Sequence, residues 1–318
     1  MNYDRRTAIT TAAAMLVGAT SLGAATRAKR PFFGKGGPEI GLQIYTLGTD
    51  PTTDLDGTFA KVAAIGYRDL ELPNLLGKTP AVLKAAADRA GLRFSSIHLG
   101  SGVMAGSGLS LDSEPQAISD ALGVLGIHSA VLPIVPIPAS FVRSADGDFR
   151  KALTRSLVEA GSDHWKKLAD TLNHRAHALK PFGIALGYHN HNVEFVDAGK
   201  GTGWDVLQAE TDPTMVHFEV DLGWVSAAGL DPVEFLHRTK GRVRWIHVKD
   251  LKASTAANTA LQMDPTEVGS GRMDWKSILP AAKAAGVQHF YVEQEPPFTM
   301  PRIDAAAKSF AYLAALKV

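Results

Sequence analysis

Short apolar runs alternate with segments of helical periodicity along the chain from residue 39 onward. The runs have the length of buried strands, and the segments between them repeat apolar residues every three or four positions. One helical segment begins at Pro80 and ends at Gly91, as helices commonly do. The pattern predicts strands over 39–46, 67–72, 92–99, 128–134, 184–191, 216–223, 243–250 and 288–295, and helices over 55–66, 79–91, 115–126, 163–183, 203–211, 231–241, 274–286 and 304–316.

Eight strand–helix units in series predict a parallel sheet with right-handed crossovers. Eight units of this size, in about 280 residues, favour an α/β fold of the (β/α)8 TIM-barrel type. A doubly wound open sheet is the alternative, but no G-x-G-x-x-G motif follows the first strand. In a TIM barrel the carboxyl ends of the strands carry the active site, so polar residues there are the candidates.

The first residues are typical of an export signal rather than of the fold. Arg5 and Arg6 precede a weakly apolar stretch, and small residues follow near Ala25 and Ala28. The arginine pair resembles a twin-arginine signal, which predicts export to the periplasm. An amphipathic or disordered N-terminus is the alternative. We expect residues 1–28 to be the signal, 29–38 a linker, and 39–318 a single catalytic domain.

Composition narrows the class of protein. The chain has 318 residues, 45% of them hydrophobic and 20% charged, which is ordinary for a globular protein. The formal net charge of +1 predicts no field that would steer nucleic acid, and no apolar run reaches the length of a membrane span. The absence of cysteine excludes disulfides, thiolate metal sites and cysteine nucleophiles. A homo-oligomer is compatible with the sequence.

The carboxyl ends of the expected strands are unusually polar. The stretch GYHNHNVEF, residues 187–195, alone contains two histidines, two asparagines and a glutamate. Asp221, His247 and Glu293 lie near the ends of the next three strands, beside His189 on the fifth. Such a mixed set of nitrogen and oxygen donors suits Mn²⁺, Fe²⁺, Co²⁺, Zn²⁺ or Mg²⁺, and its carboxylates favour the harder ions.

Each of these residues also has a purely structural interpretation. His247 taken alone fits a core histidine that is bonded to a backbone carbonyl. Asp221 fits a cap for a following helix, and Glu293 fits an ion-pair partner of Lys249. Histidines at the strand starts and on helices are expected to be structural or solvated. It is the recurrence of polar residues on four neighbouring strands that favours a site.

Seven stretches resemble the xylose isomerase-like TIM barrels, the sugar phosphate isomerase/epimerase family: GLQIYTL, IGYRDLEL, GIALGYHNHNVEF, FEVDLGWVSAAGLDP, VRWIHVKD, VGSGRMDW and FYVEQE. The resemblance implies one divalent metal ion, most often Mn²⁺, held by Glu, Asp, His and Glu from strands five to eight. The last three of these ligands map onto Asp221, His247 and Glu293. The first has no clean match, so either His189 replaces it or Glu194 reaches the metal from the loop, and we prefer His189.

The resemblance also implies an enzyme that removes a proton next to a carbonyl of a sugar or keto-sugar. Isomerisation or epimerisation is the main expectation. A lyase or dehydratase reaction, and a non-catalytic sugar-binding barrel, are the alternatives. Glu293, Glu194 and His98 are the expected proton-transfer residues, and the expected substrate-binding residues are Gln43, Glu71, Trp224, Lys249 and His191.

An endonuclease of abasic DNA shares the barrel fold. It uses about three metal ions and a basic groove for DNA. Removal of the expected signal takes away three basic residues and one acidic residue, which changes the formal charge from +1 to −1. The charge and the export signal therefore speak against nucleic acid as a partner, and a small sugar is the expected one.

Overall fold

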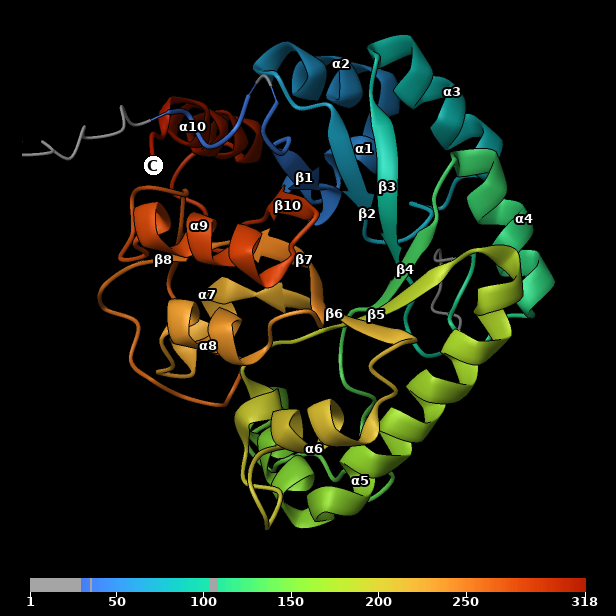
Figure 1. The fold of residues 1–318 in the computed structure, drawn as a ribbon, viewed down its shortest axis with the longest axis vertical. Helices are drawn as coiled ribbons and strands as arrows, with labels where there is room; N and C mark the ends of the chain where they lie inside the picture. Colours follow the sequence, from blue (N-terminus) through green and yellow to red (C-terminus); the bar gives the residue numbers. More distant parts are fainter. Residues whose placement is uncertain (1–29, 35, 103–107) are drawn as a thin grey trace, which may run out of the picture.

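Eight parallel strands close into a barrel in the computed structural model, which describes residues 30–34, 36–102 and 108–318 (Figure 1). Around the barrel the order is β1-β10-β7-β6-β5-β4-β3-β2, so that β1 closes the circle by pairing with β10. The architecture is the (β/α)8 TIM barrel that the alternating pattern predicts. The barrel strands are β1 (Gly41–Gln43), β2 (Asp69–Leu72), β3 (Arg93–His98), β4 (Ser129–Leu132), β5 (Ala185–His189), β6 (Val216–Asp221), β7 (Val243–Val248) and β10 (His289–Val292).

Helices surround the barrel, and a small antiparallel pair, β8 (Asp250–Leu251) with β9 (Pro265–Thr266), lies outside it (Figure 1). Three short 3₁₀ helices, η1 (Ile44–Leu47), η2 (Lys180–Phe182) and η3 (Val193–Phe195), adjoin β1 and β5. The α-helices are α1 (Asp50–Thr53), α2 (Leu55–Ile65), α3 (Pro80–Ala90), α4 (Pro115–Leu125), α5 (Phe149–Leu179), α6 (Gly203–Glu210), α7 (Leu222–Ala227), α8 (Pro232–Arg238), α9 (Trp275–Ala285) and α10 (Arg302–Ala315).

Most strands end one to three residues earlier than their apolar runs suggest, and in two of them a polar side chain turns the backbone into a helix. The sixth strand, expected over 216–223, stops at Asp221, whose Oδ1 accepts the Trp224 N–H (3.0 Å) and caps α7. The first strand stops at Gln43, whose Oε1 accepts the Tyr45 N–H (3.0 Å) at the start of η1. Side-chain caps thus fix where the site begins on these strands.

Helix α5 is longer than its periodicity predicts. It begins at Phe149, where Asp148 accepts the N–H groups of Arg150 and Lys151 and caps the helix. Gly161, with a φ of 57°, interrupts the helical geometry, which explains why the pattern was continuous only from residue 163. The first part of α5 therefore lies before the helix that the sequence predicts over 163–183.

Large aromatic side chains fill the barrel beneath its mouth. Trp245 and Tyr291 pack with Val131 inside the barrel, and both aromatic residues are fully buried. Gly187 makes room for them, because a Cβ at this position would lie 2.9 Å from the Trp245 ring. Likewise a Cβ at Gly41 would lie 2.6 Å from the Tyr291 ring. This packed layer is the floor of the site.

The stretch expected to be a linker packs against the barrel where the structure describes it. Phe32 and Phe33 are buried and meet Phe290 edge to face, with ring centroids 5.5 and 5.6 Å apart. The backbone of Phe32 donates to the carbonyl of Leu316, which ties this stretch to the C-terminal residues. The expected export signal, residues 1–28, lies outside the described residues.

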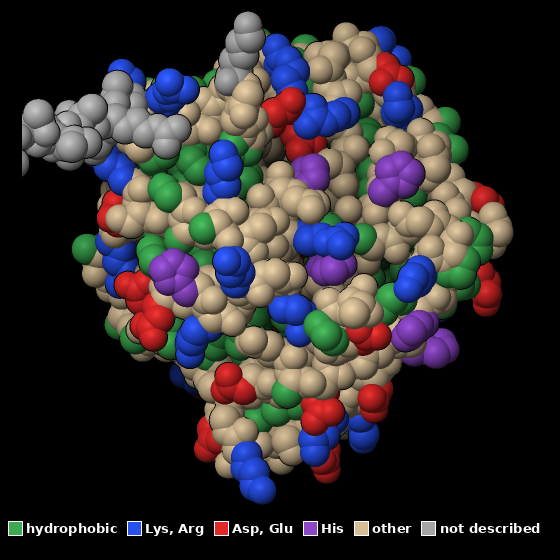
Figure 2. All heavy atoms as spheres, in the orientation of Figure 1, with side chains coloured by type: hydrophobic (Ala, Val, Ile, Leu, Met, Phe, Trp, Pro, Cys, Tyr) green, Lys and Arg blue, Asp and Glu red, His purple; other side chains and the backbone are tan. Residues whose placement is uncertain are grey.

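Positive and negative side chains alternate over the face of the molecule shown in Figure 2, with no large area of one sign. This agrees with the formal net charge of +1. Among the residues that the structure places, none of the helices has both the length and the apolar character needed to cross a membrane.

Candidate functional site

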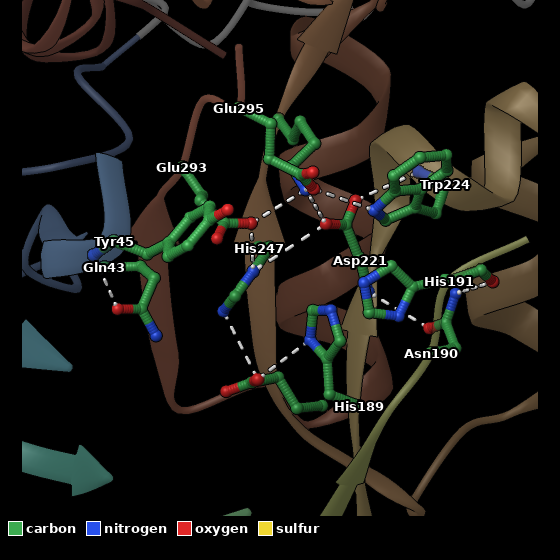
Figure 3. Close-up of polar contacts among 12 residues, drawn as sticks. Gln43, Tyr45, His189, Asn190, His191, Asp221, Trp224, His247, Glu293 and Glu295 are labelled. Carbon is green, nitrogen blue, oxygen red and sulfur yellow. Dashed lines mark hydrogen bonds and ion pairs between the residues drawn. The ribbon is translucent and has the colours of Figure 1, made fainter. Parts of the chain in front are cut away.

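Polar side chains from neighbouring strands meet at the carboxyl end of the barrel (Figure 3). Because side chains on a strand alternate between two faces, Glu219 and Asp221 on β6 both point inward. His247 on β7 pairs with Asp221, and His189 on β5 pairs with Glu219. These residues form two layers, an inner one at Glu219 and an outer one at Asp221.

The inner layer centres on one carboxylate oxygen, Oε2 of Glu219. His98 Nε2 lies 2.9 Å from it, His189 Nδ1 3.0 Å and His247 Nε2 3.2 Å. Glu71 joins the layer from β2, on the other side of the barrel: its Oε2 lies 2.8 Å from His247 Nε2 and 3.3 Å from His98 Nε2. Two carboxylates and three imidazoles thus share a buried space.

Register irregularities occur in the strands that supply two of the histidines. The pairing of β2 with β3 shifts between Leu70 and Glu71, and that of β6 with β7 shifts between Phe218 and Glu219. The extra residues are Ser95 in β3 and Arg244 in β7. An extra residue re-aims the side chains that follow it on its own strand, here His98 and His247.

The inner layer carries opposite charges that stabilise one another. Burial opposes ionisation, but the neighbouring Glu71 and Glu219 raise the pKa of His98 to about 10. Burial and Glu71 raise the pKa of Glu219, yet His247, His98 and the His189 bond outweigh them and hold it at about 2. Burial and His247 lower the pKa of His189, which leaves that imidazole neutral. Its Nδ1 donates to Glu219, so its Nε2 keeps a lone pair.

The outer layer is organised by a buried ammonium group. Lys249 Nζ lies 2.7 Å from Asp221 Oδ2, 2.7 Å from Glu293 Oε2 and 2.6 Å from Glu295 Oε1. These carboxylates outweigh the burial of the lysine and raise its pKa well above the ordinary value. Burial opposes ionisation of Glu293, but Lys249 and His247 together hold its pKa well below the ordinary range. This layer already contains its own cation.

Within the described part of the chain, two groups of side chains could hold a metal ion. His98, His189, Glu219 and His247 each offer a ligand atom, and these atoms lie within 4.8 Å of one another; Asp221, His247 and Glu293 form the second group. In the second group Lys249 already neutralises the carboxylates. In the first, Oε1 of Glu219 is buried and has no hydrogen-bond partner among the described residues. A donor set of three imidazoles and a carboxylate fits a divalent first-row metal.

The structure brings together all four residues that the sequence predicts as metal ligands. His189 contributes to the inner layer, Asp221 and Glu293 to the outer one, and His247 to both. Glu219, which sequence analysis did not assign, is the residue on which the histidines converge. The signal was present, since Glu219 lies two positions before Asp221 and so shares its face of the strand.

Glu194 does not join these layers. Its Oε1 accepts the Tyr188 hydroxyl (2.6 Å) and its Oε2 accepts the His191 N–H (2.8 Å). Tyr188 precedes His189 on β5 and therefore faces away from the barrel interior. Burial raises the pKa of Glu194 to about 7. In the structure this carboxyl holds the loop after β5 in place through these two hydrogen bonds. This position differs from the expected role in proton transfer or metal binding.

A pocket of about 270 Å³ opens above the two layers. His98, His189, His191, Glu293 and Glu295 line it, together with Tyr45 and four residues of the loops after β2 and β4. The Nδ1 of His191 is buried and has no partner among the described residues, and burial lowers the pKa of this imidazole. His191 therefore presents a neutral ring beside the pocket.

The remaining predicted substrate residues take supporting positions. Gln43 Nε2 donates to Glu71 Oε2 (2.9 Å), and both side chains are fully buried. The Trp224 indole N–H donates to Glu295 Oε1 (3.2 Å), and its ring lies 5.3 Å from Lys249 Nζ. Gln43 and Glu71 therefore lie below the pocket, and Trp224 lies beside its outer layer. Lys249 and His98 belong to the layers themselves.

A TIM barrel with a metal-capable cluster and a small-molecule pocket at the carboxyl ends of its strands has the architecture of a barrel enzyme. Residues 59–316 match the family described as Xylose isomerase-like TIM barrel, and this stretch is most of the chain. The chain belongs to that family, which confirms the resemblance seen in the sequence.

Curated relatives are named inosose dehydratase. The protein from Geobacillus kaustophilus is 28% identical over 201 residues, which cover 62% of this chain and 62% of that protein. The match thus spans less than two thirds of the Geobacillus protein. The Lacticaseibacillus casei protein is 25% identical over 293 residues, which cover 87% of this chain and 91% of that protein.

Solved structures show the same barrel. A sugar phosphate isomerase/epimerase from Parabacteroides distasonis is 26% identical with a TM-score of 0.67, over 94% of this chain and 99% of that one. A 3-keto-D-glucoside 4-epimerase from E. coli is 18% identical with a TM-score of 0.57, over 88% of this chain and 100% of that one. The second likeness supports the fold alone.

Proposed function

We propose that this protein is a metal-dependent enzyme that removes a proton next to the carbonyl of a keto-sugar or keto-cyclitol and then eliminates a β-hydroxyl group as water. The observation that carries the proposal is the cluster of His98, His189, Glu219 and His247 beneath a pocket of small-molecule size. The relatives named inosose dehydratase favour elimination.

His98, His189, Glu219 and His247 would hold the divalent ion. Sequence analysis named His189, Asp221, His247 and Glu293 instead. We favour Glu219 over Asp221 because Lys249 Nζ already lies 2.7 Å from Asp221 Oδ2, whereas Oε1 of Glu219 has neither an ion-pair nor a hydrogen-bond partner among the described residues. When bound, such an ion polarises a carbonyl oxygen and so acidifies the neighbouring C–H.

His191 is the group best suited to move the proton. Its ring is neutral and lines the pocket, and its Nδ1 has no partner in the described part of the chain. The imidazole takes the proton from carbon, and the C–H electron pair forms the enolate. The imidazolium then returns a proton to the β-hydroxyl, and water leaves as the C=C bond forms. Because burial lowers the pKa of this ring, its imidazolium is a stronger acid for the second step, and its imidazole a weaker base for the first, than an ordinary histidine.

Glu293 and Lys249 have an electrostatic role in this scheme. Glu293 is ionised and held by Lys249 and His247, so it is a poor base in the metal-free protein. The fixed ammonium of Lys249 offsets the negative charge of Asp221, Glu293 and Glu295, so these carboxylates repel the charge that develops on the substrate less strongly. A single imidazole can thus act as both base and acid, and Glu194 is not needed for either step.

The test is to incubate the metal-loaded protein with an inosose in D₂O and to follow the products by NMR and ultraviolet absorbance. Deuterium at the carbon next to the carbonyl, together with an absorbing dehydration product, is expected. His191→Asn should abolish both signals, and Glu210→Gln, at an exposed helix end, should leave both unchanged.

Isomerisation or epimerisation is the second candidate, which the Parabacteroides structure favours. Deuterium incorporation without loss of water would support it over elimination. Absence of exchange with inososes and with a panel of keto-sugars, in protein shown to contain metal, would refute both and leave a sugar-binding barrel.

A further inference from the structure

A second pocket continues outward from the first. It has a volume of about 340 Å³, and it shares Ile134, His191 and Glu295 with the inner pocket. The two pockets therefore adjoin each other at the mouth of the barrel. A substrate whose reacting ring occupies the inner pocket would point its substituents into the outer one.

Seven of the ten residues that line the outer pocket are apolar, and the other three are Arg150, His191 and Glu295. Phe149 comes from the start of α5, Leu261 and Met263 from the segment before β9, and Trp224 from α7, with Pro296 and Pro297 after β10. A polyhydroxylated ring would need many polar partners here, because its hydroxyl groups lose water on binding. An apolar ring gains from burial against such a surface and can stack on an aromatic face.

The wall of this pocket is held in a strained shape. Leu261 has a φ of 54°, a left-handed conformation that branched side chains seldom adopt. Asn192 fixes it, since its Oδ1 accepts the Leu261 N–H (2.9 Å) and its Nδ2 donates to the Asn258 carbonyl (2.8 Å). Thr154 on α5 donates to the Thr259 carbonyl (3.2 Å) and ties the same segment to the helix.

Such strain persists where the surroundings enforce it, and it is concentrated at ligand-binding sites. Here the hydrogen bonds keep Leu261 in the wall of the pocket. Trp224 is fixed in the same way by its bond to Glu295. The outer pocket is therefore built in advance, with an aliphatic wall and an aromatic one.

We propose that the outer pocket binds an aromatic ring attached to the reacting ring of the substrate, so that the substrate is a keto-sugar or keto-cyclitol carrying an aryl substituent. This inference rests on the proposed function for the identity of the reacting ring. The occupant is part of the substrate, because the outer pocket adjoins the inner one and shares His191 and Glu295 with it.

Calorimetry on the metal-loaded full chain tests this inference with two probes, phenyl β-D-glucopyranoside and methyl β-D-glucopyranoside. The phenyl compound should bind roughly ten- to a hundredfold more tightly, the range expected for burial of one aromatic ring. Leu261→Asn should remove this preference and leave the methyl compound unaffected. Asparagine tolerates a positive φ, so this variant is expected to keep the fold.

Val142→Asn is the matched control, because Val142 is an exposed apolar residue that does not line either pocket. It should bind both probes as the unmodified protein does. Equal affinities for the two probes, or no binding of either, would overturn the outer-pocket proposal even if deuterium exchange with inosose succeeds. A phenyl preference lost in Leu261→Asn would support it even if the exchange test fails.

Discussion

Glu219 is the carboxylate on which three histidines converge, and its replacement by glutamine tests the charge arrangement of the inner layer. The variant keeps the shape and one carbonyl acceptor but removes the negative charge. His98 and His247 would then be buried cations with Glu71 as the remaining carboxylate of the layer. We expect metal-free Glu219→Gln protein to be less stable than the unmodified protein.

The structure gives the size of this effect. At about 1.4 kcal/mol per pKa unit, a pKa held at about 2 instead of the ordinary 4.5 corresponds to about 3.5 kcal/mol. Breaking a buried ion pair by removing one partner costs about 3–5 kcal/mol, which is the same range. Because the glutamine carbonyl still accepts one hydrogen bond, we expect the lower figure, about 3 kcal/mol.

The sign of the pH dependence follows from the lowered pKa. A carboxylate whose folded-state pKa is depressed contributes stability that is fully present above its unfolded value, here 4.5, and is lost as the pH falls toward about 2. The difference in unfolding free energy between Glu219→Gln and the unmodified protein should therefore be largest at neutral pH. It should shrink as the pH is lowered from 4.5 toward 2.

Urea unfolding of chelator-treated protein at several pH values measures this difference. Glu210→Gln is the control for the loss of one acidic residue at an exposed position. A difference below about 1 kcal/mol at pH 7, within the scatter of surface substitutions, would refute the described charge state. So would a large difference that does not change between pH 4.5 and 3.

Three other outcomes follow from the packing and the charges. Gly187→Ala places a methyl group 2.9 Å from the Trp245 ring and should lower the free energy of unfolding in urea by about 1–3 kcal/mol. An unchanged free energy of unfolding would show that the packed layer below the site can rearrange around the methyl group. The pKa of Glu194 is raised to about 7, so its contribution to stability is present below 4.5 and lost as the pH rises to 7; Glu194→Gln should lack this slope. Because His98 has a pKa of about 10, metal binding near pH 7 should release protons, seen as calorimetric heats that vary with the buffer; buffer-independent heats would contradict this.

Much of the fold is a local property of the sequence. The alternation of apolar runs with helical periodicity gave eight strands and their helices to within a few residues, because side-chain periodicity is set by backbone geometry. The boundaries shifted where a single side chain caps a helix, as Asp221 does for α7. The longest error, at the start of α5, occurred where Gly161 breaks the periodicity.

The sequence also located the edge of the barrel at which the site lies. His189, Asp221, His247 and Glu293 lie at the ends of their strands, and a closed barrel necessarily brings such ends together. Even Glu219 could have been found, since it alternates with Asp221 on one strand.

By contrast, the tertiary structure decided how deeply each side chain of the site is buried and which partners it contacts. Glu71 and His247 are 176 residues apart and meet at 2.8 Å because the barrel closes, with an extra residue in β3 and another in β7. Lys249 could have faced solvent, but closure buries it among the outer carboxylates and so leaves the inner layer for a metal. Glu194 does not reach the inner or the outer layer, because its carboxylate accepts the hydroxyl of Tyr188, which faces away from the barrel interior. Strand periodicity fixes which way a side chain points, whereas the closed register fixes what it meets.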